Sequence, residues 1–220
     1  VLEDSKRFGL VSEVEPLDDE TVQMLQALGY MGGSDAPQGV EGMDPKDGVR
    51  AFDELDQARQ LAIGGDYESA KKVLQGLLKR VPRNASARNL LAMCELRTGN
   101  TEGVEELYLQ SLAYEPRQPE VLVQLGRLQL QEGKLDAARA RFQEALNVEP
   151  ADIAAMMLLA HIELRENRPE AAKIWYDKAI AADPNDPAPY LQYGDFYFRQ
   201  NEPAEARRWY ERALERQPDS

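Results

Sequence analysis

The chain has 220 residues, of which 43% are hydrophobic and 30% are charged, and its formal net charge is −13. An acidic protein lacks the basic stripe with which proteins bind phosphate backbones, and no apolar run approaches the ~20 residues of a membrane-spanning helix. The composition therefore argues against a nucleic-acid partner and against membrane insertion. It is ordinary for a soluble helical protein.

Residues 1–48 form an acidic leading segment. Ten Asp and Glu against two basic residues give residues 1–45 a net charge of −8. Acids at positions 18–20 precede an amphipathic stretch at 21–28 that ends before Gly29, which predicts a short helix with negative charge at its N-terminus. The glycine-rich residues 32–39 read as a linker, and we expect the chain to enter the next region after residues 44–47.

The remaining residues, 49–220, carry a repeat. Prolines recur every 34 residues, at Pro82, Pro116, Pro150, Pro184 and Pro218. Mostly small residues precede each proline by 24 and by 12 positions: Ala58, Ala92, Gly126, Ala160 and Gly194, and Ala70, Val104, Ala138, Ala172 and Ala206. Large residues precede it by eight: Leu74, Tyr108, Phe142, Tyr176 and Tyr210. Between the two small positions stand Gly65, Gly99, Gly133, Asn167 and Asn201, which tolerate a left-handed turn. The spacing predicts stacked helix pairs in which small residues let two helices approach closely and large residues fill the groove between one pair and the next.

This pattern resembles the tetratricopeptide repeat. Residues 119–152 are the clearest copy, with Leu122, Leu125, Gly126, Gly133, Ala138, Phe142, Ala145 and Pro150 at the positions of the family motif. The first two copies depart from it, with Leu77 and Ser111 in place of alanine and Glu95 in place of a large residue. The resemblance implies an all-α fold, a right-handed α-solenoid of five units at about 51–84, 85–118, 119–152, 153–186 and 187–220.

A second resemblance concerns the order of segments. An acidic stretch, Leu25-Gln26-Ala27-Leu28-Gly29-Tyr30, a glycine-rich spacer, Asp44-Pro45-Lys46-Asp47 and a repeat array follow one another. This order resembles the C-terminal region of bacterial sulfatase-like hydrolases of the alkaline phosphatase superfamily that carry tetratricopeptide tails. It implies an accessory region of an exported hydrolase, in the bacterial periplasm or outside the cell. A cytoplasmic location and a free-standing scaffold for envelope or secretion-complex assembly are the alternatives.

The chain itself shows no catalytic pattern. Cys94 is followed by Glu-Leu-Arg-Thr, which does not match the nucleophile motif of sulfatases, and one cysteine cannot form an internal disulfide. A single histidine without clustered acids or thiols argues against a metal site, and we expect no cofactor. We therefore expect a non-catalytic chain, which in a parent hydrolase would present or orient substrate, and a packed, inert Cys94.

Positions 5, 9, 12 and 13 of each first helix form a stripe beside the surface that packs on the partner helix. In the tetratricopeptide family this stripe lines a concave groove. The candidate peptide-contacting residues are Arg59, Asn89, Met93, Arg97, Val123, Arg127, Gln131, Met157, His161, Arg165, Asp195 and Arg199.

Five arginines stand against one aspartate in this set, so we expect a protein or peptide partner with an acidic or C-terminal segment. The alternative is that the arginines are solvated or pair with glutamates of the next unit. Residues 1–45 could also fold back, so that their acids occupy the stripe and regulate access. Leu55 and Arg59 do not match the lysine and asparagine of the family's best-known carboxylate clamp, so binding of chaperone tails is not supported.

The last unit is rich in aromatic residues and ends without the extra polar helix that usually covers the final apolar face of a solenoid. Core packing is the first explanation for these rings. We nevertheless expect Trp209 and Tyr210 to form an association face for another copy or another domain.

Overall fold

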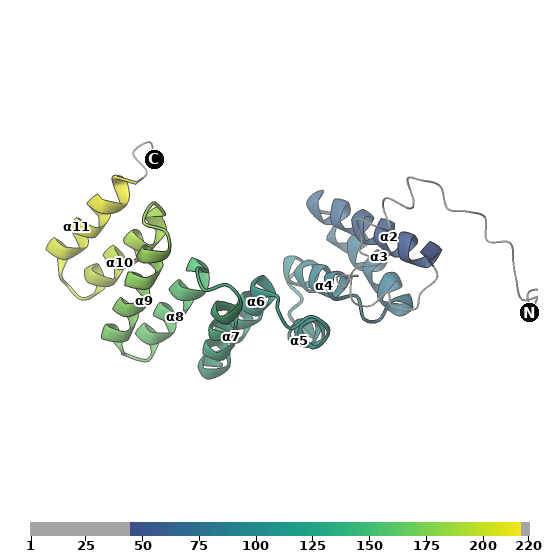
Figure 1. Ribbon diagram of the computed structural model, residues 1–220, viewed down its shortest axis with the longest axis horizontal. Coiled ribbons are helices and arrows are strands. Elements are labelled where there is room, and N and C mark those ends of the chain that lie inside the picture. Colours follow the sequence, from purple (N-terminus) through teal and green to yellow (C-terminus); the bar gives the residue numbers. More distant parts are fainter. Residues whose placement is uncertain (1–44, 217–220) are drawn as a thin grey trace, which may run out of the picture.

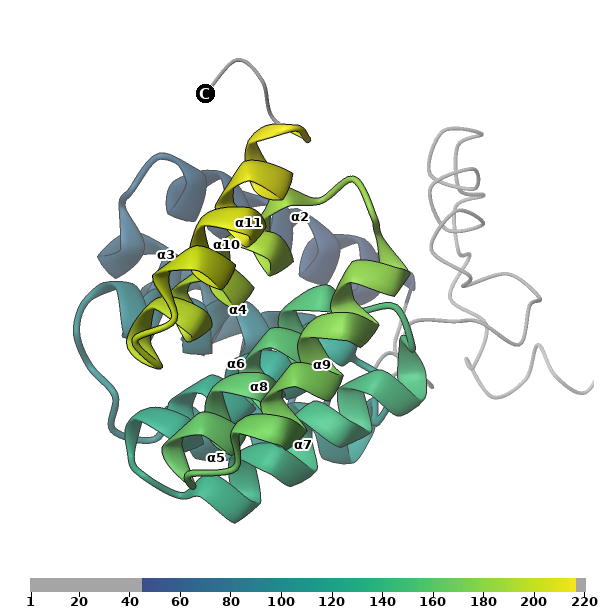
Figure 2. The same cartoon turned by 90° about the vertical axis from the view of Figure 1, so that its left-hand side faces the viewer.

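The computed structural model of the protein describes residues 45–216. These residues form ten α-helices: α2 (Pro45–Ile63), α3 (Tyr67–Arg80), α4 (Ala85–Arg97), α5 (Val104–Tyr114), α6 (Pro119–Gln131), α7 (Leu135–Val148), α8 (Ile153–Arg165), α9 (Pro169–Ala182), α10 (Pro187–Arg199) and α11 (Pro203–Leu214). Consecutive helices pair and the pairs follow one another in an arc (Figure 1). When the molecule is viewed along its length, the chain of helix pairs runs from α2 down through α5–α8 and back up to α11 (Figure 2). The predicted all-α solenoid is confirmed.

The first helix, α2, begins at Pro45, four residues before the expected start of the repeat region at residue 49. Proline suits the first position of a helix because the N–H that it lacks would have no partner within the helix. Residues 1–44, which include the predicted short helix and the glycine-rich linker, lie outside the described part of the chain.

Within each pair, the two helices are joined by a turn with a left-handed residue at the predicted position, and the α4–α5 turn has a second one at Gly103. The backbone φ is 83° at Gly65, 78° at Gly99, 77° at Gly133, 58° at Asn167 and 62° at Asn201. Glycine and asparagine are the residues that tolerate this conformation at a helix end. The predicted turn residues are therefore confirmed, and each reverses the chain so that the second helix packs on the first.

Small residues on the first helix of a pair let the large residue of the second helix approach its backbone. A Cβ atom added at Gly126 would lie 2.5 Å from the Phe142 ring, and one added at Gly194 would lie 2.5 Å from the Tyr210 ring. Both distances are far below van der Waals contact, so these two positions accept no side chain without a shift. The small residues allow the predicted close approach, and these two large rings pack within their own pairs, a contact that the prediction of a groove between pairs did not include.

Apolar clusters also bridge neighbouring pairs. One buried cluster contains Leu122 of α6, Phe142 of α7 and Leu159 of α8. Another joins Ala160 and Tyr176 of the fourth pair to Tyr193 and Phe196 of α10. A third cluster, formed by α2, α3 and α4, holds Cys94, whose burial raises the pKa of the thiol, as expected for a packed and inert cysteine. The core is thus a continuous layer along the arc.

A second set of contacts joins the second helix of each pair to the first helix of the next, and we call it the seam. Its pairs are Lys71–Glu95, Glu105–Gln129 and Arg139–Glu163, with Lys173 over the Tyr197 ring at the same place in the last step. Lys71 Nζ lies 3.2 Å from Glu95 Oε2, and Gln129 donates to Glu105 at 2.8 Å. The unusual Glu95 is therefore explained by a base that stands 24 residues earlier in the chain.

Candidate functional site

Three adjoining pockets run along α4, α6, α8 and α10, the first helices of four successive pairs. The N-terminal and middle pockets share Glu120 and Gln124, and the middle and C-terminal pockets share Arg127 and Ala154. Because neighbouring pockets share lining residues, they form one continuous groove. An elongated groove of this kind suits an extended chain segment better than a compact small molecule.

The N-terminal pocket has a volume of about 530 Å³ and contains the predicted Asn89, Met93 and Arg97. The Asn89 amide donates to Gln118 Oε1 at 2.7 Å, while its own Oδ1 is buried without a partner among residues 45–216. Arg97 is exposed and makes no hydrogen bond or ion pair within the same range. A buried amide oxygen without a donor and a free guanidinium are both groups that a bound segment could satisfy.

The middle pocket, of about 410 Å³, contains the predicted Val123 and Arg127. Its remaining lining includes the acids Glu120, Glu149 and Asp152. The Asp152 side chain accepts the backbone N–H of Ala155 at 2.9 Å and so caps the N-terminus of α8. The middle pocket thus has three acids and one arginine, whereas each end pocket has one acid and two arginines.

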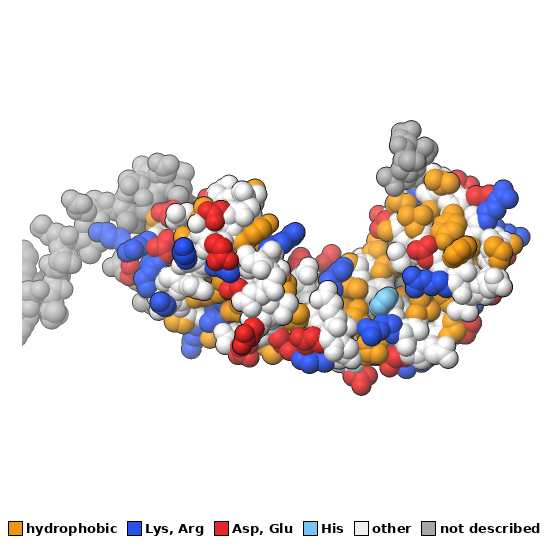
Figure 3. Space-filling model, turned by 180° about the vertical axis from the view of Figure 1, so that it is seen from behind, with side chains coloured by type: hydrophobic (Ala, Val, Ile, Leu, Met, Phe, Trp, Pro, Cys, Tyr) orange, Lys and Arg blue, Asp and Glu red, His pale blue; other side chains and the backbone are white. Residues whose placement is uncertain are grey.

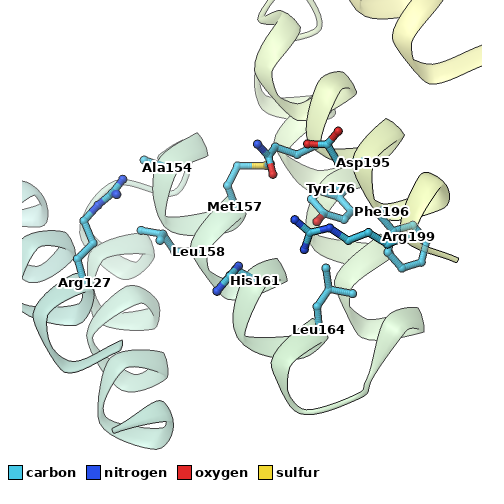
Figure 4. A pocket seen from close by; sticks show the side chains of 11 residues that line it. Arg127, Ala154, Met157, Leu158, His161, Leu164, Tyr176, Asp195, Phe196 and Arg199 are labelled. Carbon is cyan, nitrogen blue, oxygen red and sulfur yellow. The ribbon is translucent and has the colours of Figure 1, made fainter. Parts of the chain in front are cut away.

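The C-terminal pocket has a volume of about 230 Å³ and is shared by α6, α8, α9 and α10. It brings together five of the predicted residues: Arg127, Met157, His161, Asp195 and Arg199. Figure 4 shows Arg199 reaching from α10 toward His161 on α8, with the Tyr176 ring behind them. In the space-filling view the single histidine lies beside basic side chains on the C-terminal arm of the arc (Figure 3).

Positive charge dominates the surroundings of His161. Partial burial lowers the pKa of its imidazole below the ordinary 6.5, and the nearby Arg165 and Arg199 lower it further. The one acid of the pocket, Asp195, accepts a hydrogen bond from Tyr210 Oη at 2.8 Å. Arg127 and Arg199 have no hydrogen bond or ion pair with any residue between 45 and 216. The pocket therefore holds cationic and donor groups without a matching number of acids.

Three predicted residues are placed differently. Arg59 lies 3.7 Å from Asp56 on its own helix α2, before the N-terminal pocket. Arg165 donates from Nη1 to the Leu130 carbonyl at 3.1 Å and so ties α8 to the end of α6. Gln131 is exposed at the C-terminus of α6. The structure does not place these three in the lining of the three pockets described above.

Two family models described as tetratricopeptide repeat match the chain, one at residues 123–187 and the other at 61–122 and 163–220. The chain belongs to the tetratricopeptide repeat family. No curated protein sequence is significantly similar to it.

Solved structures share the tetratricopeptide fold. MamA has a TM-score of 0.65 at 20% identity, over 73% of this chain and 94% of MamA. PilF of Pseudomonas aeruginosa has a TM-score of 0.67 at 22% identity, over 77% of this chain and 78% of PilF. YrrB, described as a TPR protein with an unusual peptide-binding site, has a TM-score of 0.62 at 16% identity, over 77% of this chain and 87% of YrrB.

Several lining residues of this tetratricopeptide groove were not in the predicted stripe. Glu120, Gln124 and Gln192 occupy the second and sixth positions of their first helices, and Arg117 and Tyr176 lie outside first helices altogether. Helical periodicity could have found the first three, because positions 2 and 6 lie three or four residues from positions 5 and 9 on the same face. Neither Arg117 nor Tyr176 could have been found in this way.

Trp209 and Tyr210 lie on the last helix of the tetratricopeptide array. The Trp209 ring stacks on Tyr193 at 4.1 Å between centroids, and the Arg212 guanidinium lies 4.4 Å above it. Tyr210 packs on Gly194 and donates to Asp195. Both rings are half-buried within the last pair, so the association face remains a prediction that rests on the partly exposed edge of each ring.

Over residues 45–216, no group of three or more His, Cys, Asp or Glu could hold a metal ion. None of the ten described helices has the length and hydropathy of a membrane span.

Proposed function

We propose that this tetratricopeptide module binds an extended segment of a partner protein in the groove, and that the segment carries carboxylates. One observation carries the proposal. Arg97, Arg127 and Arg199 have no acidic partner among the described residues, whereas the bases of the seam are paired. An exposed arginine can pair with a carboxylate through two parallel hydrogen bonds, so a row of unpaired arginines favours an acidic ligand.

Apolar side chains between these arginines indicate the second part of the ligand. Met157 lines the groove beside Arg127 and Arg199, and Leu191 and Phe198 on α10 are 43% and 67% exposed, whereas Val123 is only 6% exposed. A segment that alternates acidic and apolar residues would place carboxylates on the arginines and side chains on this apolar surface. YrrB, by its description, shows that the fold can carry a peptide-binding site.

The experiment measures binding of a fluorescent eight-residue peptide that alternates Glu and Leu, by anisotropy, with a Gln and Leu peptide for comparison. The test variant is R97E/R127E/R199E. The control variant, K79E/R207E/R208E, makes the same change in charge on second helices α3 and α11, away from the groove. Each lost charge-assisted hydrogen bond is worth about 1.5–3 kcal/mol, so the loss of two of them is enough for the test variant to bind about 100-fold more weakly.

The result that supports the proposal is loss of binding in R97E/R127E/R199E, normal binding in the control, and an unchanged helical signal by circular dichroism. Equal binding of the Glu and Gln peptides would contradict the acidic preference. Equal weakening in both variants would show that overall charge, rather than the groove, determines binding.

The partner protein depends on the wider context of the module. The segment order at residues 18–47 supports a role as a non-catalytic accessory region of an exported sulfatase-like hydrolase, where the groove would hold a partner or present a substrate. These residues lie outside the described part of the chain. The gene sequence that precedes the codon for Val1 tests this role, because a sulfatase-like domain there supports it and an unrelated domain favours the free-standing scaffold.

A further inference from the structure

The C-terminal pocket has a feature that the rest of the groove lacks, a titratable base near two guanidinium groups, Arg199 in the pocket and Arg165 beside it. His161 is the one histidine in the sequence, and its side chain is exposed to the pocket rather than packed in the core. It makes no hydrogen bond or ion pair with residues 45–216. A neutral imidazole in this place has donor and acceptor groups that no described protein group uses.

Charged and titratable groups lie on each helix that forms the pocket around His161. Arg165 shares its helix, Arg127 comes from α6, Tyr176 from α9, and Asp195 and Arg199 from α10. Three are arginines, and Asp195 already accepts the Tyr210 hydroxyl. Burial raises the pKa of Tyr176 to about 12, so Tyr176 stays neutral near pH 7. On the neighbouring face of α8, the Glu163 carboxylate pairs with Arg139 of α7 and with Arg168 at the start of α9.

The pocket also has an apolar side. Met157 and Leu164 of α8 and Phe196 of α10 line it together with the basic residues (Figure 4). A carboxylate that enters beside Arg199 therefore leaves the neighbouring residues of its chain against apolar surface. Partial burial strengthens the attraction between the carboxylate and the cations compared with the same groups in water.

We propose that this pocket is a proton-linked carboxylate subsite, in which Arg199 and a protonated His161 together hold one carboxylate of the bound segment. The proposal rests on the function proposed above and adds a dependence on pH. Before binding, the two arginines disfavour a third positive charge on His161. A bound carboxylate cancels that repulsion and favours the imidazolium, so binding takes up a proton.

The direction of the pH dependence follows from linkage. The pKa of the free imidazole lies below 6.5, and a carboxylate within about 4–6 Å raises it. Affinity therefore increases as the pH falls through the range between the two values. A shift of one pKa unit corresponds to at most a tenfold change in affinity, so we expect the Glu and Leu peptide to bind about fivefold more tightly at about pH 5.5 than at about pH 7.5. Glutamate side chains, with an ordinary pKa of about 4.3, remain ionised over this range.

The test uses the full chain, the Glu and Leu peptide and two measurements. NMR of the imidazole protons follows the titration of His161 without ambiguity, because the sequence has one histidine. Anisotropy gives the peptide affinity at both pH values for the wild type and for H161Q, which keeps a polar side chain that does not titrate. Because the coupling is reciprocal, the rise in pKa on binding must account for the change in affinity with pH.

The expected result is a free pKa below 6.5, an increase of about one unit with peptide, and flat binding between the two pH values in H161Q. A second variant, R199Q, should raise the free pKa of His161 and weaken binding, while R207Q on α11 should change neither. Binding that leaves the His161 pKa unchanged, or that keeps its pH dependence in H161Q, would overturn the subsite and leave the groove intact. Absence of binding at both pH values would overturn the proposed function and the subsite with it.

Discussion

The seam and the groove both carry charged residues at fixed positions of the repeat, yet they use charge in opposite ways. Across the seam, Lys71 meets Glu95 and Arg139 meets Glu163, so each base of these pairs has an acid on the next helix pair. Along the groove, Arg97, Arg127 and Arg199 meet no acid within residues 45–216. The repeat spacing alone does not show whether a charged side chain stabilises the stack or is free to bind a ligand. The presence of an ion-pair partner within the chain does.

Burial follows the same division. Glu163 is buried at 5% exposure between two guanidinium groups, while the groove arginines are exposed. A buried ion is stable only with its partners, because the charge has lost its contact with water. An exposed arginine has lost little solvation and is free to bind a ligand. We therefore expect seam substitutions to change stability and groove substitutions to change binding.

The largest expected effect is that of Glu163→Ala. Loss of the buried carboxylate leaves Arg139 and Arg168 facing each other without it, although both keep contacts with Glu166. Since Arg139 is partly exposed and Arg168 is about half-exposed, we expect a loss of about 2 kcal/mol in the free energy of unfolding, below the 3–5 kcal/mol of a fully buried pair. Urea denaturation followed by circular dichroism measures it.

A matched control for this change is Glu144→Ala, which removes an exposed acid paired with Arg141 on its own helix. We expect that variant to lose no more than about 0.5 kcal/mol. Peptide affinity should be unchanged in both variants. A Glu163→Ala protein as stable as the Glu144→Ala protein would mean that the seam does not stabilise the stack.

A smaller effect should appear on acidification. Hydrogen bonds from Lys134 and Gln129 lower the pKa of Glu105, and its two arginines lower that of Glu163 against the opposing effect of burial. Because both folded pKa values lie below the unfolded ones, their contribution is complete above about pH 4.5 and is lost as the pH falls through the folded values. The double variant E105Q/E163Q should be less stable than the wild type at neutral pH and should lose less stability between about pH 5 and pH 3. Parallel loss in the two proteins would assign acid unfolding to other groups.

The sequence predicted what depends on period. The turn residues, the close approach of the helices at Gly126 and the alignment of the groove helices all follow from residues at fixed spacing. It did not predict contacts that depend on side-chain direction. Arg165 occupies the same helix position as Arg199, yet it donates to the Leu130 carbonyl. That oxygen already accepts the Gly133 N–H, and a carbonyl oxygen has a second lone pair for a further donor. Glu95 likewise departs from the family motif, and its ion pair with Lys71, which accounts for the departure, is not visible in the repeat spacing.

The smallest expected change in stability is that of Arg127→Ala, and it gives the sharpest contrast with the seam. Arg127 forms no ion pair within the described residues, so its removal should change the free energy of unfolding by no more than about 0.5 kcal/mol. Arg139→Ala removes the same kind of side chain from α7. It leaves the buried Glu163 carboxylate with Arg168 as its remaining partner. That protein should lose about 1–2 kcal/mol. Peptide binding should show the reverse order, weak in Arg127→Ala and normal in Arg139→Ala. If both properties changed together in either protein, the seam and the groove would be one coupled network, and the separation of structural from binding charges by their partners would be wrong.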